Sequence, residues 1–358
     1  MLARSALMFP RPNRADVACI VFLTITVAVF FADVLIGDRV MVPIDNLYRA
    51  EPWRSLAAEQ AVGIPHNDLI GDQILQNVAW KTFARNHVLR GELPLWNPYE
   101  FAGLPFLAGG QSGTLYPLGV VFYLLPVLHA YGWFLAIHTW LAGAFTFLFL
   151  RVLGLRPPSA LFGGIAFAYS AFLIVSYVWP MIVSAAVWLP LLLLVLELTV
   201  RAHERGAALA TRLPLVVGGS LVIALEILAG HLEITFYVLA TAALYASGRL
   251  AWPLLARRQW RSAASASAEM LAMPAIGFLL AGVQLVPFAE LIAQNVRMGQ
   301  VSYQDVIGYA LPSRQIATFL LPEIFGSPTR HHILDITTWT WREVGLNAHG
   351  SPTDPPGT

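Results

Sequence analysis

The apolar residues of the chain are gathered into long runs, not into the short alternating segments of a soluble fold. The first run, 17–37, follows a basic N-terminal segment, 1–16, and we expect it to remain as a signal anchor. Six further runs reach spanning length, at 131–150, 159–178, 181–200, 213–230, 232–247 and 270–293. The pattern predicts an all-α polytopic membrane protein with about seven transmembrane helices.

The basic residues predict how these spans are oriented. The segments expected in the cytoplasm hold 3 (1–16), 2 (151–158), 3 (201–212) and 4 (248–269) Lys or Arg residues. The much longer segments 38–114 and 293–358 hold only 6 and 4. Because short cytoplasmic segments carry the excess of Lys and Arg, we expect the N-terminus inside and both long segments outside.

The segment between the first two spans, 38–130, is expected to be a large folded extracytoplasmic loop. We predict a helix from Asp72 to Leu89, with one apolar face formed by Ile74, Val78, Phe83 and Val88. The stretch 115–128 is apolar but short and bracketed by prolines, which favours a re-entrant or interfacial element. The six-helix region 131–293 leads to an extracytoplasmic segment, 294–358, whose polar tail after 326 is expected to be mobile.

The composition of the chain argues against several classes of function. The chain is 57% hydrophobic and 12% charged, whereas soluble domains carry roughly a quarter charged residues. A net charge of +1 without a basic aromatic stripe argues against a nucleic-acid partner. The single cysteine, Cys19, allows no intrachain disulfide and no cysteine-based metal site. Soluble nucleotide-sugar chemistry is not indicated, because no Walker loop or GxGxxG pattern occurs in a fitting context.

Four segments carry a resemblance to a known family. They are NDLIGDQILQNVAW (67–80), RGELPLWNPYEFAGLPFLAGGQSGTLYPL (90–118), AGHLEITFY (229–237) and LLPEIFGSP (320–328). Together they resemble the YfhO-type bacterial membrane proteins, grouped with the C-type glycosyltransferases. Members of that family continue with further spans, whereas here we expect a short polar tail after the seventh.

The resemblance implies an enzyme of the bacterial plasma membrane. It would take a sugar from a polyprenyl-phosphate carrier and place it on a cell-envelope glycan or polymer outside the membrane. Such transfer needs a carboxylate that accepts the acceptor's proton or holds a divalent metal, and cationic or amide groups that stabilise the departing phosphate. The metal requirement is left open.

Two carboxylates of the outer loop are catalytic candidates. By the resemblance Asp72 occupies the family's first-loop acidic position, and the alternative is that it only caps the predicted helix. Asp45 follows the first span, and the alternative for it is an ordinary solvated carboxylate.

Substrate-binding candidates lie in the same loop. Arg85, His87 and Arg90 could face a lipid phosphate, or they could form a solvated face or contact lipid headgroups. An aromatic and amide group suits stacking on a sugar and hydrogen bonding to it, although an interfacial aromatic belt is a rival interpretation for Trp96. This group comprises Trp96, Asn97, Tyr99 and Gln111.

Polar residues within the apolar runs add further candidates. Glu226 is the most deeply placed acid, and ionisable residues at such depth usually face a polar interior. His231 and Glu233 occupy the tight turn that follows, where they could complete a site beneath the loop or simply mark the water interface. We expect His138 and Gln284 to be helix–helix hydrogen-bond partners.

Two other functions remain open at this level. A transporter or flippase for a lipid-linked glycan would share the apolar body and the buried Glu226, but it needs no acidic and aromatic loop of 77 residues (38–114). A non-catalytic membrane scaffold is the second alternative.

Overall fold

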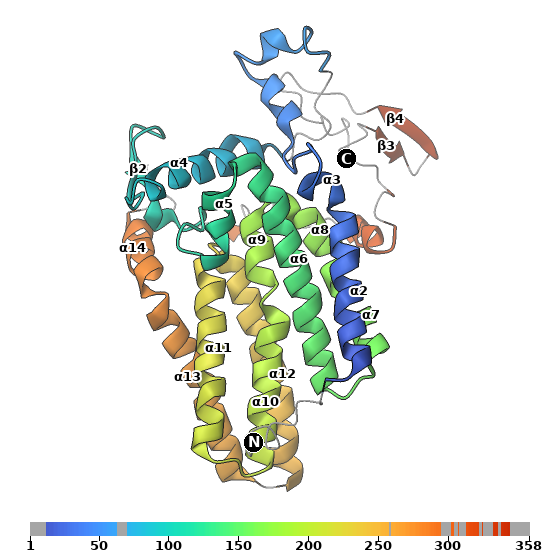
Figure 1. Ribbon diagram of the computed structural model, residues 1–358, viewed down its shortest axis with the longest axis vertical. Helices are drawn as coiled ribbons and strands as arrows, with labels where there is room; N and C mark the ends of the chain where they lie inside the picture. Colours follow the sequence, from blue (N-terminus) through green and yellow to red (C-terminus); the bar gives the residue numbers. More distant parts are fainter. Residues whose placement is uncertain are drawn as a thin grey trace. The chain divides into compact units, whose positions relative to one another are not determined.

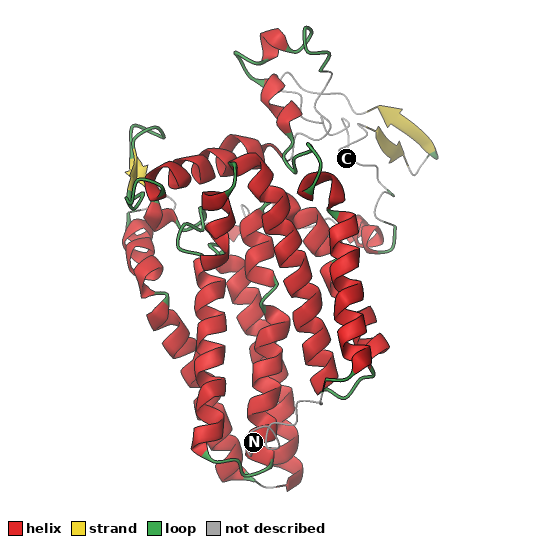
Figure 2. Ribbon diagram, viewed as in Figure 1, coloured by secondary structure: helices red, strands yellow, loops and turns green. Residues whose placement is uncertain are grey.

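The computed structural model of the protein describes residues 12–62, 70–257, 259–294, 302–303, 307, 313–321, 324, 332–335 and 338–343. The described residues are mainly helical (Figure 2) and fall into two compact units. The bundle unit comprises Met1–Met41 and Val78–Ala293, and the second unit comprises Val42–Asn77 and Gln294–Thr358.

The bundle unit is built on long apolar helices (Figure 1). They are α2 (Arg14–Phe30), α6 (Val127–Val152), α7 (Pro157–Ala168), α10 (Leu189–Glu204), α11 (Leu209–Leu228), α12 (Leu232–Arg257), α13 (Trp260–Leu280) and α14 (Gly282–Ala293). Short helices join them: α3 (Ala32–Leu35), α5 (Val121–Leu124), α8 (Ala171–Val175), α9 (Pro180–Ala186) and the 3-10 turns η5 (Leu107–Gly109), η6 (Pro117–Val120) and η7 (Ser176–Val178).

One end of the bundle is crossed by helix α4 (Val78–Val88), which lies across the long helices in Figure 1. We call this the α4 end. The opposite end holds the turn between α10 and α11 and the ion pairs of Arg201, Arg212 and Arg249, and we call it the arginine end. A small hairpin of β1 (Trp96–Asn97) and β2 (Leu104–Pro105) belongs to the α4 end, with Trp96 opposite Pro105 and Asn97 opposite Leu104.

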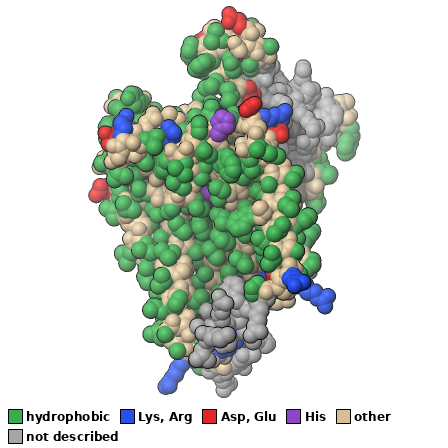
Figure 3. Space-filling view, viewed as in Figure 1, with side chains coloured by type: hydrophobic (Ala, Val, Ile, Leu, Met, Phe, Trp, Pro, Cys, Tyr) green, Lys and Arg blue, Asp and Glu red, His purple; other side chains and the backbone are tan. Residues whose placement is uncertain are grey.

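The chain is an all-α membrane protein that crosses the bilayer several times. Five helical stretches are long and apolar enough to span: Val127–Val152, Pro157–Val178, Pro180–Glu204, Leu209–Leu228 and Trp260–Leu280. The space-filling view shows apolar side chains covering the flank of the bundle, with charged groups gathered toward the ends (Figure 3). A flank of this kind is stable against lipid and not against water.

Small residues bring the helices together. A Cβ on Gly164 of α7 would lie 2.7 Å from the carbonyl oxygen of Gly143 on α6. A Cβ on Gly277 of α13 would lie 2.9 Å from the side chain of Ile223 on α11. Without a hydrophobic force between helices in lipid, such close packing is a main source of their association.

Several helices differ from the sequence prediction in their boundaries. The run 159–178 is divided at Ser170, whose side chain caps α8, and the run 181–200 is divided before α10, which carries a proline in its first turn. The run 270–293 begins earlier, at Trp260, and is divided at Ala281. Stretch 115–128 forms only η6, α5 and the start of α6.

The second unit consists of short elements. They are the 3-10 helices η1 (Ile44–Arg49), η2 (Arg54–Leu56) and η8 (Ser313–Phe319), the π-helical turn η4 (Gln73–Asn77), and strands β3 (His332–Asp335) and β4 (Thr340–Glu343). Strands β3 and β4 pair antiparallel, and they lie in the tail that we expected to be mobile. Residues 344–358 lie outside the described residues.

Candidate functional site at the α4 end

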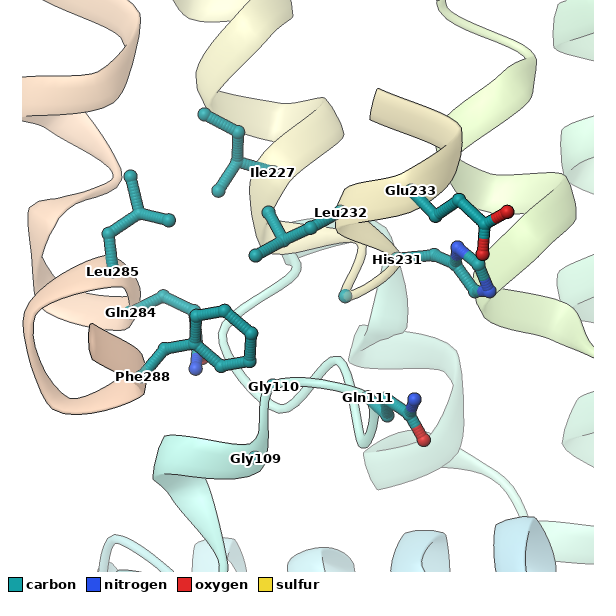
Figure 4. A pocket seen from close by; sticks show the side chains of 11 residues that line it. Gly109, Gly110, Gln111, Ile227, His231, Leu232, Glu233, Gln284, Leu285 and Phe288 are labelled. Atoms are coloured by element: carbon teal, nitrogen blue, oxygen red, sulfur yellow. The ribbon is translucent and has the colours of Figure 1, made fainter. Parts of the chain in front are cut away.

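A cavity of about 250 Å³ opens in the bundle unit where a loop meets a helix turn (Figure 4). Its walls come from the loop after η5, from the turn between α11 and α12, and from α14. The lining residues are Gly109, Gly110, Gln111, Ile227, Gly230, His231, Leu232, Glu233, Gln284, Leu285 and Phe288. Three of the sequence candidates, Gln111, His231 and Glu233, are thereby brought to one site.

Glycines allow the loop to lie directly on the helix turn. Gly110, Gly113 and Gly230 have φ angles of +74°, +57° and +96°, which favour glycine. A Cβ on Gly230 would collide with the carbonyl oxygen of Gly110, and one on Gly113 would lie 3.4 Å from the carbonyl oxygen of Ala229. The cavity therefore depends on backbone contacts that other residues would disturb.

Gln284 fixes the other side of the loop. Its buried side-chain nitrogen Nε2 donates to the carbonyl oxygens of Leu107, at 2.8 Å, and Ala108, at 3.4 Å. We expected a helix–helix partner at this position. Gln284 bonds the backbone of η5 instead, because that turn packs against α14.

His231 and Glu233 stand at the start of α12 and form the polar part of the cavity. The backbone N–H of Ile234 donates to His231 Nδ1 at 3.3 Å, so the proton of the neutral imidazole is on Nε2. Burial lowers the pKa of His231, and the nearby Glu233 carboxylate opposes that shift. Glu233 is exposed, and its Oε1 accepts from the Tyr237 hydroxyl at 3.0 Å. Figure 4 shows the Glu233 carboxylate beside the His231 ring.

Lys81 lies behind the loop and was not among the sequence candidates. Its buried ammonium donates to the carbonyl oxygen of Ser112 at 2.6 Å and lies 4.6 Å from the centre of the Phe122 ring. Burial lowers the pKa of Lys81 to about 7. The position of a Cβ on Gly113 lies 3.5 Å from this ammonium, so the lysine supports the same glycine-rich loop from the bundle side.

A buried trio fixes the end of that loop to two spanning helices. His138 Nδ1 lies 2.7 Å from the carbonyl oxygen of Phe134, which can only accept, so Nδ1 carries the proton. His138 Nε2 therefore accepts from the Tyr116 hydroxyl at 2.8 Å, and that hydroxyl accepts from Trp188 Nε1 at 3.2 Å. His138, expected to bond between helices, bonds to the loop instead.

Glu226 lies near the C-terminal end of α11. The residue is fully buried, and both carboxylate oxygens are without a hydrogen-bond partner among the described residues. Its neighbour Ile227 lines the cavity, whereas Glu226 does not. Burying a carboxylate without a hydrogen-bond donor costs free energy, and in membrane proteins such residues are usually functional. Glu226 is therefore a candidate functional residue.

The three basic candidates of α4 do not converge. Arg85 has a buried Nε without a hydrogen-bond partner among the described residues. His87 Nδ1 bonds to the carbonyl oxygen of Phe83 at 3.0 Å, and exposed Arg90 pairs with Glu92 at 3.2 Å. None of the three lines the cavity.

The hairpin candidates do not line the cavity. Asn97 is buried, and its Oδ1 accepts from the backbone N–H of Tyr99 at 3.0 Å, which stabilises the turn. Trp96 and Tyr99 are exposed on the hairpin surface.

The two catalytic candidates of the loop, Asp45 and Asp72, belong to the second unit. Asp45 lies in η1. Asp72 is exposed and immediately precedes the π-helical turn, and its carbonyl oxygen accepts from Asn77 Nδ2 at 3.4 Å. The α-helix expected from Asp72 is regular only from Val78, and single π turns are frequent at functional sites.

No group of three or more His, Cys, Asp or Glu side chains gathers as metal ligands within the described part of the chain. Comparisons of the chain with family models, with curated proteins and with solved structures found no match.

Proposed function

We propose that the protein is a glycosyltransferase that moves a sugar from a polyprenyl-phosphate carrier to a cell-envelope acceptor outside the bacterial plasma membrane. Seven spans are proposed, with α2 and α12 added to the five long apolar stretches and with α13 and α14 together forming the last. The clustering of arginines at one end supports a cytoplasmic location for that end and an outer location for the α4 end.

The observation that carries the proposal is the meeting of two distant sequence segments at one cavity. The lining residues 109–111 come from the segment 90–118, and the lining residues 230–233 come from the segment 229–237. Both segments are part of the family resemblance. The cavity has apolar walls with a few convergent polar groups, as small-molecule sites usually have.

The cavity offers groups suited to transfer. The acceptor hydroxyl oxygen would bond to the anomeric carbon, the bond from that carbon to the phosphate oxygen would break, and the hydroxyl proton would pass to a carboxylate. Glu233 is the carboxylate of the cavity, and the Nε2–H of His231 can donate to an oxygen. Arg85 of α4, which does not line the cavity, is the proposed cation for the phosphate.

Two carboxylates thus compete for the role of base: Glu233, on the basis of the cavity, and Asp72, on the basis of the resemblance. Purified protein in proteoliposomes, supplied with a polyprenyl-phosphate sugar and an envelope glycan, distinguishes them. Glu233→Gln and Asp72→Asn each remove only the charge. The variant that lacks the base should lose at least about a hundredfold in transfer. Absence of transfer by the wild-type protein with a range of sugars would contradict the proposed function.

A specific observation favours a second candidate, a flippase for a lipid-linked glycan. Glu226 is fully buried in α11 without a hydrogen-bond partner among the described residues, as in groups that face a transport pathway. The same proteoliposomes with a fluorescent lipid-linked glycan measure its movement between leaflets. Movement without transfer would favour the flippase, and neither activity would favour a scaffold.

A further inference from the structure

The hairpin at the α4 end presents large apolar side chains to its surroundings. Along 93–101 five large apolar residues are exposed: Leu93 (60%), Leu95 (61%), Trp96 (55%), Tyr99 (85%) and Phe101 (94%). We call residues 93–106 the aromatic hairpin. None of these five side chains lines the cavity, and a sugar site would need a concave surface.

The aromatic hairpin is held in place by hydrogen bonds and by a ring contact with α4. The backbone N–H of Phe106 donates to the carbonyl oxygen of Leu95 at 2.9 Å, and Trp80 Nε1 of α4 donates to Glu100 Oε1 at 3.0 Å. The Phe83 ring of α4 lies edge-on to Phe106, with 4.8 Å between ring centres. The hairpin is therefore mounted on α4, and its apolar tip is held outward.

The tip of the hairpin has backbone φ angles that are unfavourable for residues other than glycine. Phe101 and Ala102 have φ angles of +51° and +63°, in the left-handed region that side chains other than glycine seldom adopt. Strain of this kind persists where the surrounding structure holds it in place, and it clusters at functional sites. Phe101, at this tip, is 94% exposed.

The aromatic hairpin leads into a turn that adjoins an exposed apolar surface of the bundle. Directly after it, η5 packs against α14, whose Val283 and Val286 are exposed by 58% and 61%. Figure 1 shows the hairpin, marked β2, at the edge of the bundle beside α14. The exposed ion pair of Arg90 and Glu92 lies at the hairpin base, next to the apolar side chains. Apolar and aromatic side chains with charges at their border match the headgroup region of a bilayer.

We propose that the aromatic hairpin inserts its tip, Tyr99 and Phe101, into the lipid headgroup region at the α4 end of the bundle. The tip would hold α4, and through it the loop of the cavity, at a fixed depth. This role depends on the membrane setting of the chain and not on the proposed transfer reaction.

A labelling experiment in lipid nanodiscs tests the insertion. Cys19→Ala removes the single native cysteine, and Ala102→Cys then places an environment-sensitive fluorophore beside the tip while Phe101 stays in place. Two control sites bracket it: Ala208→Cys in the exposed turn between α10 and α11, and Leu244→Cys on α12, where the side chain is 76% exposed on an apolar helix. Quenchers are a headgroup-attached nitroxide lipid and aqueous iodide.

We expect headgroup nitroxide to quench the label at 102 at least twofold more than the label at 208, and iodide to quench it less. Replacing Tyr99 and Phe101 by Ser in the Ala102→Cys protein should abolish that difference. Equal quenching at 102 and 208 would overturn the insertion. Lipid quenching that survives both serine substitutions would overturn the role of the aromatic tip. Neither readout uses transfer activity, so failure here is distinct from failure of the proposed function.

Discussion

The two ends of the bundle differ in how their buried charged side chains are hydrogen-bonded. At the arginine end, the Glu197 carboxylate accepts from Arg201 and Arg249, both at 2.7 Å, and from the Tyr245 hydroxyl at 2.8 Å. Glu269 likewise accepts from Arg212 at 2.5 Å and pairs with His203 at 2.9 Å. Both oxygens of Glu197 and at least one oxygen of Glu269 accept from a donor.

At the α4 end, the buried charges lack such partners. Lys81 bonds only a neutral carbonyl oxygen and aromatic rings, and Glu226 has no hydrogen-bond partner on either oxygen, as far as the described residues show. Complete networks specify a packed arrangement, and incomplete ones are where ligands and protons are handled. From this contrast we propose that the arginine end stabilises the structure and that the α4 end carries the proposed function.

The largest effect should follow from breaking the network at the arginine end. Glu197→Gln would leave Arg201 and Arg249 without their carboxylate, and removing one member of a buried ion pair costs about 3–5 kcal/mol. We expect a lower midpoint of thermal unfolding in detergent and less folded protein on size-exclusion chromatography.

Glu204→Gln is the matched control for that change. Glu204 also pairs with Arg249, but at 3.6 Å and with both side chains more than a quarter exposed. It should cost less than about 1 kcal/mol. Equal loss in the two variants would mean that burial of the Glu197 network does not stabilise the arginine end.

Gly230→Ala tests the backbone contact under the cavity. The left-handed φ of Gly230 should cost alanine about 1–2 kcal/mol, and the collision with the Gly110 carbonyl oxygen should add about 1–3 kcal/mol. Gly206 also has a positive φ, of +63°, but a Cβ there would lie within 4 Å of no atom. Gly206→Ala therefore measures the cost of the backbone conformation alone. Unfolding midpoints that fall equally in both variants would show that the loop does not rest on Gly230.

Lys81 should give stability an unusual dependence on pH. Its pKa is about 7 when folded and about 10.5 when free, so between these values the unfolded chain binds more protons than the folded one. Stability contributed by this site therefore rises with pH above about 7, by up to about 1.4 kcal/mol per pH unit, and is flat below it.

The measurement compares the wild-type protein with Lys81→Met from pH 6 to 9. Subtracting the free energies of unfolding of the two proteins at each pH cancels the contributions of the other titrating groups. The free energy of unfolding of the wild-type protein should increase relative to that of the variant as pH rises. Parallel curves would show that the lysine is not deprotonated on folding.

Five of the seven runs predicted as spans overlap helical stretches that are long and apolar enough to cross a membrane. Run 213–230 closely matches α11, because nearly every residue of a lipid-exposed span must be apolar. The face of α4 was harder to predict. Ile74, Val78, Phe83 and Val88 suggested an apolar buried face, yet the buried positions of that stretch include Asn77 and Lys81.

Tertiary contacts explain that difference. Lys81 is buried by Ser112 and Phe122, which are 31 and 41 positions later in the chain, and a local pattern contains no information about them. The cavity has the same origin, because it unites residues from 109 to 288. The tight turn at His231 and the glycine-rich loop were visible in the sequence, but the contact between them was not.

The smallest change in stability, and the sharpest test of the contrast, should come from Glu226. Because its carboxylate has no donor among the described residues, Glu226→Gln and Glu226→Leu remove no ion pair and leave no cation alone. We expect both variants to stay within about 1 kcal/mol of the wild type, with leucine the more stable, since it also removes an unsatisfied polar group. The identical substitutions at Glu197 should be strongly destabilising. Transfer or glycan movement should nevertheless fall in both Glu226 variants. If Glu226→Leu were as unstable as Glu197→Leu, Glu226 would be a structural group, and the distinction between the two ends would fail; if it were stable and fully active, Glu226 would have no role in function.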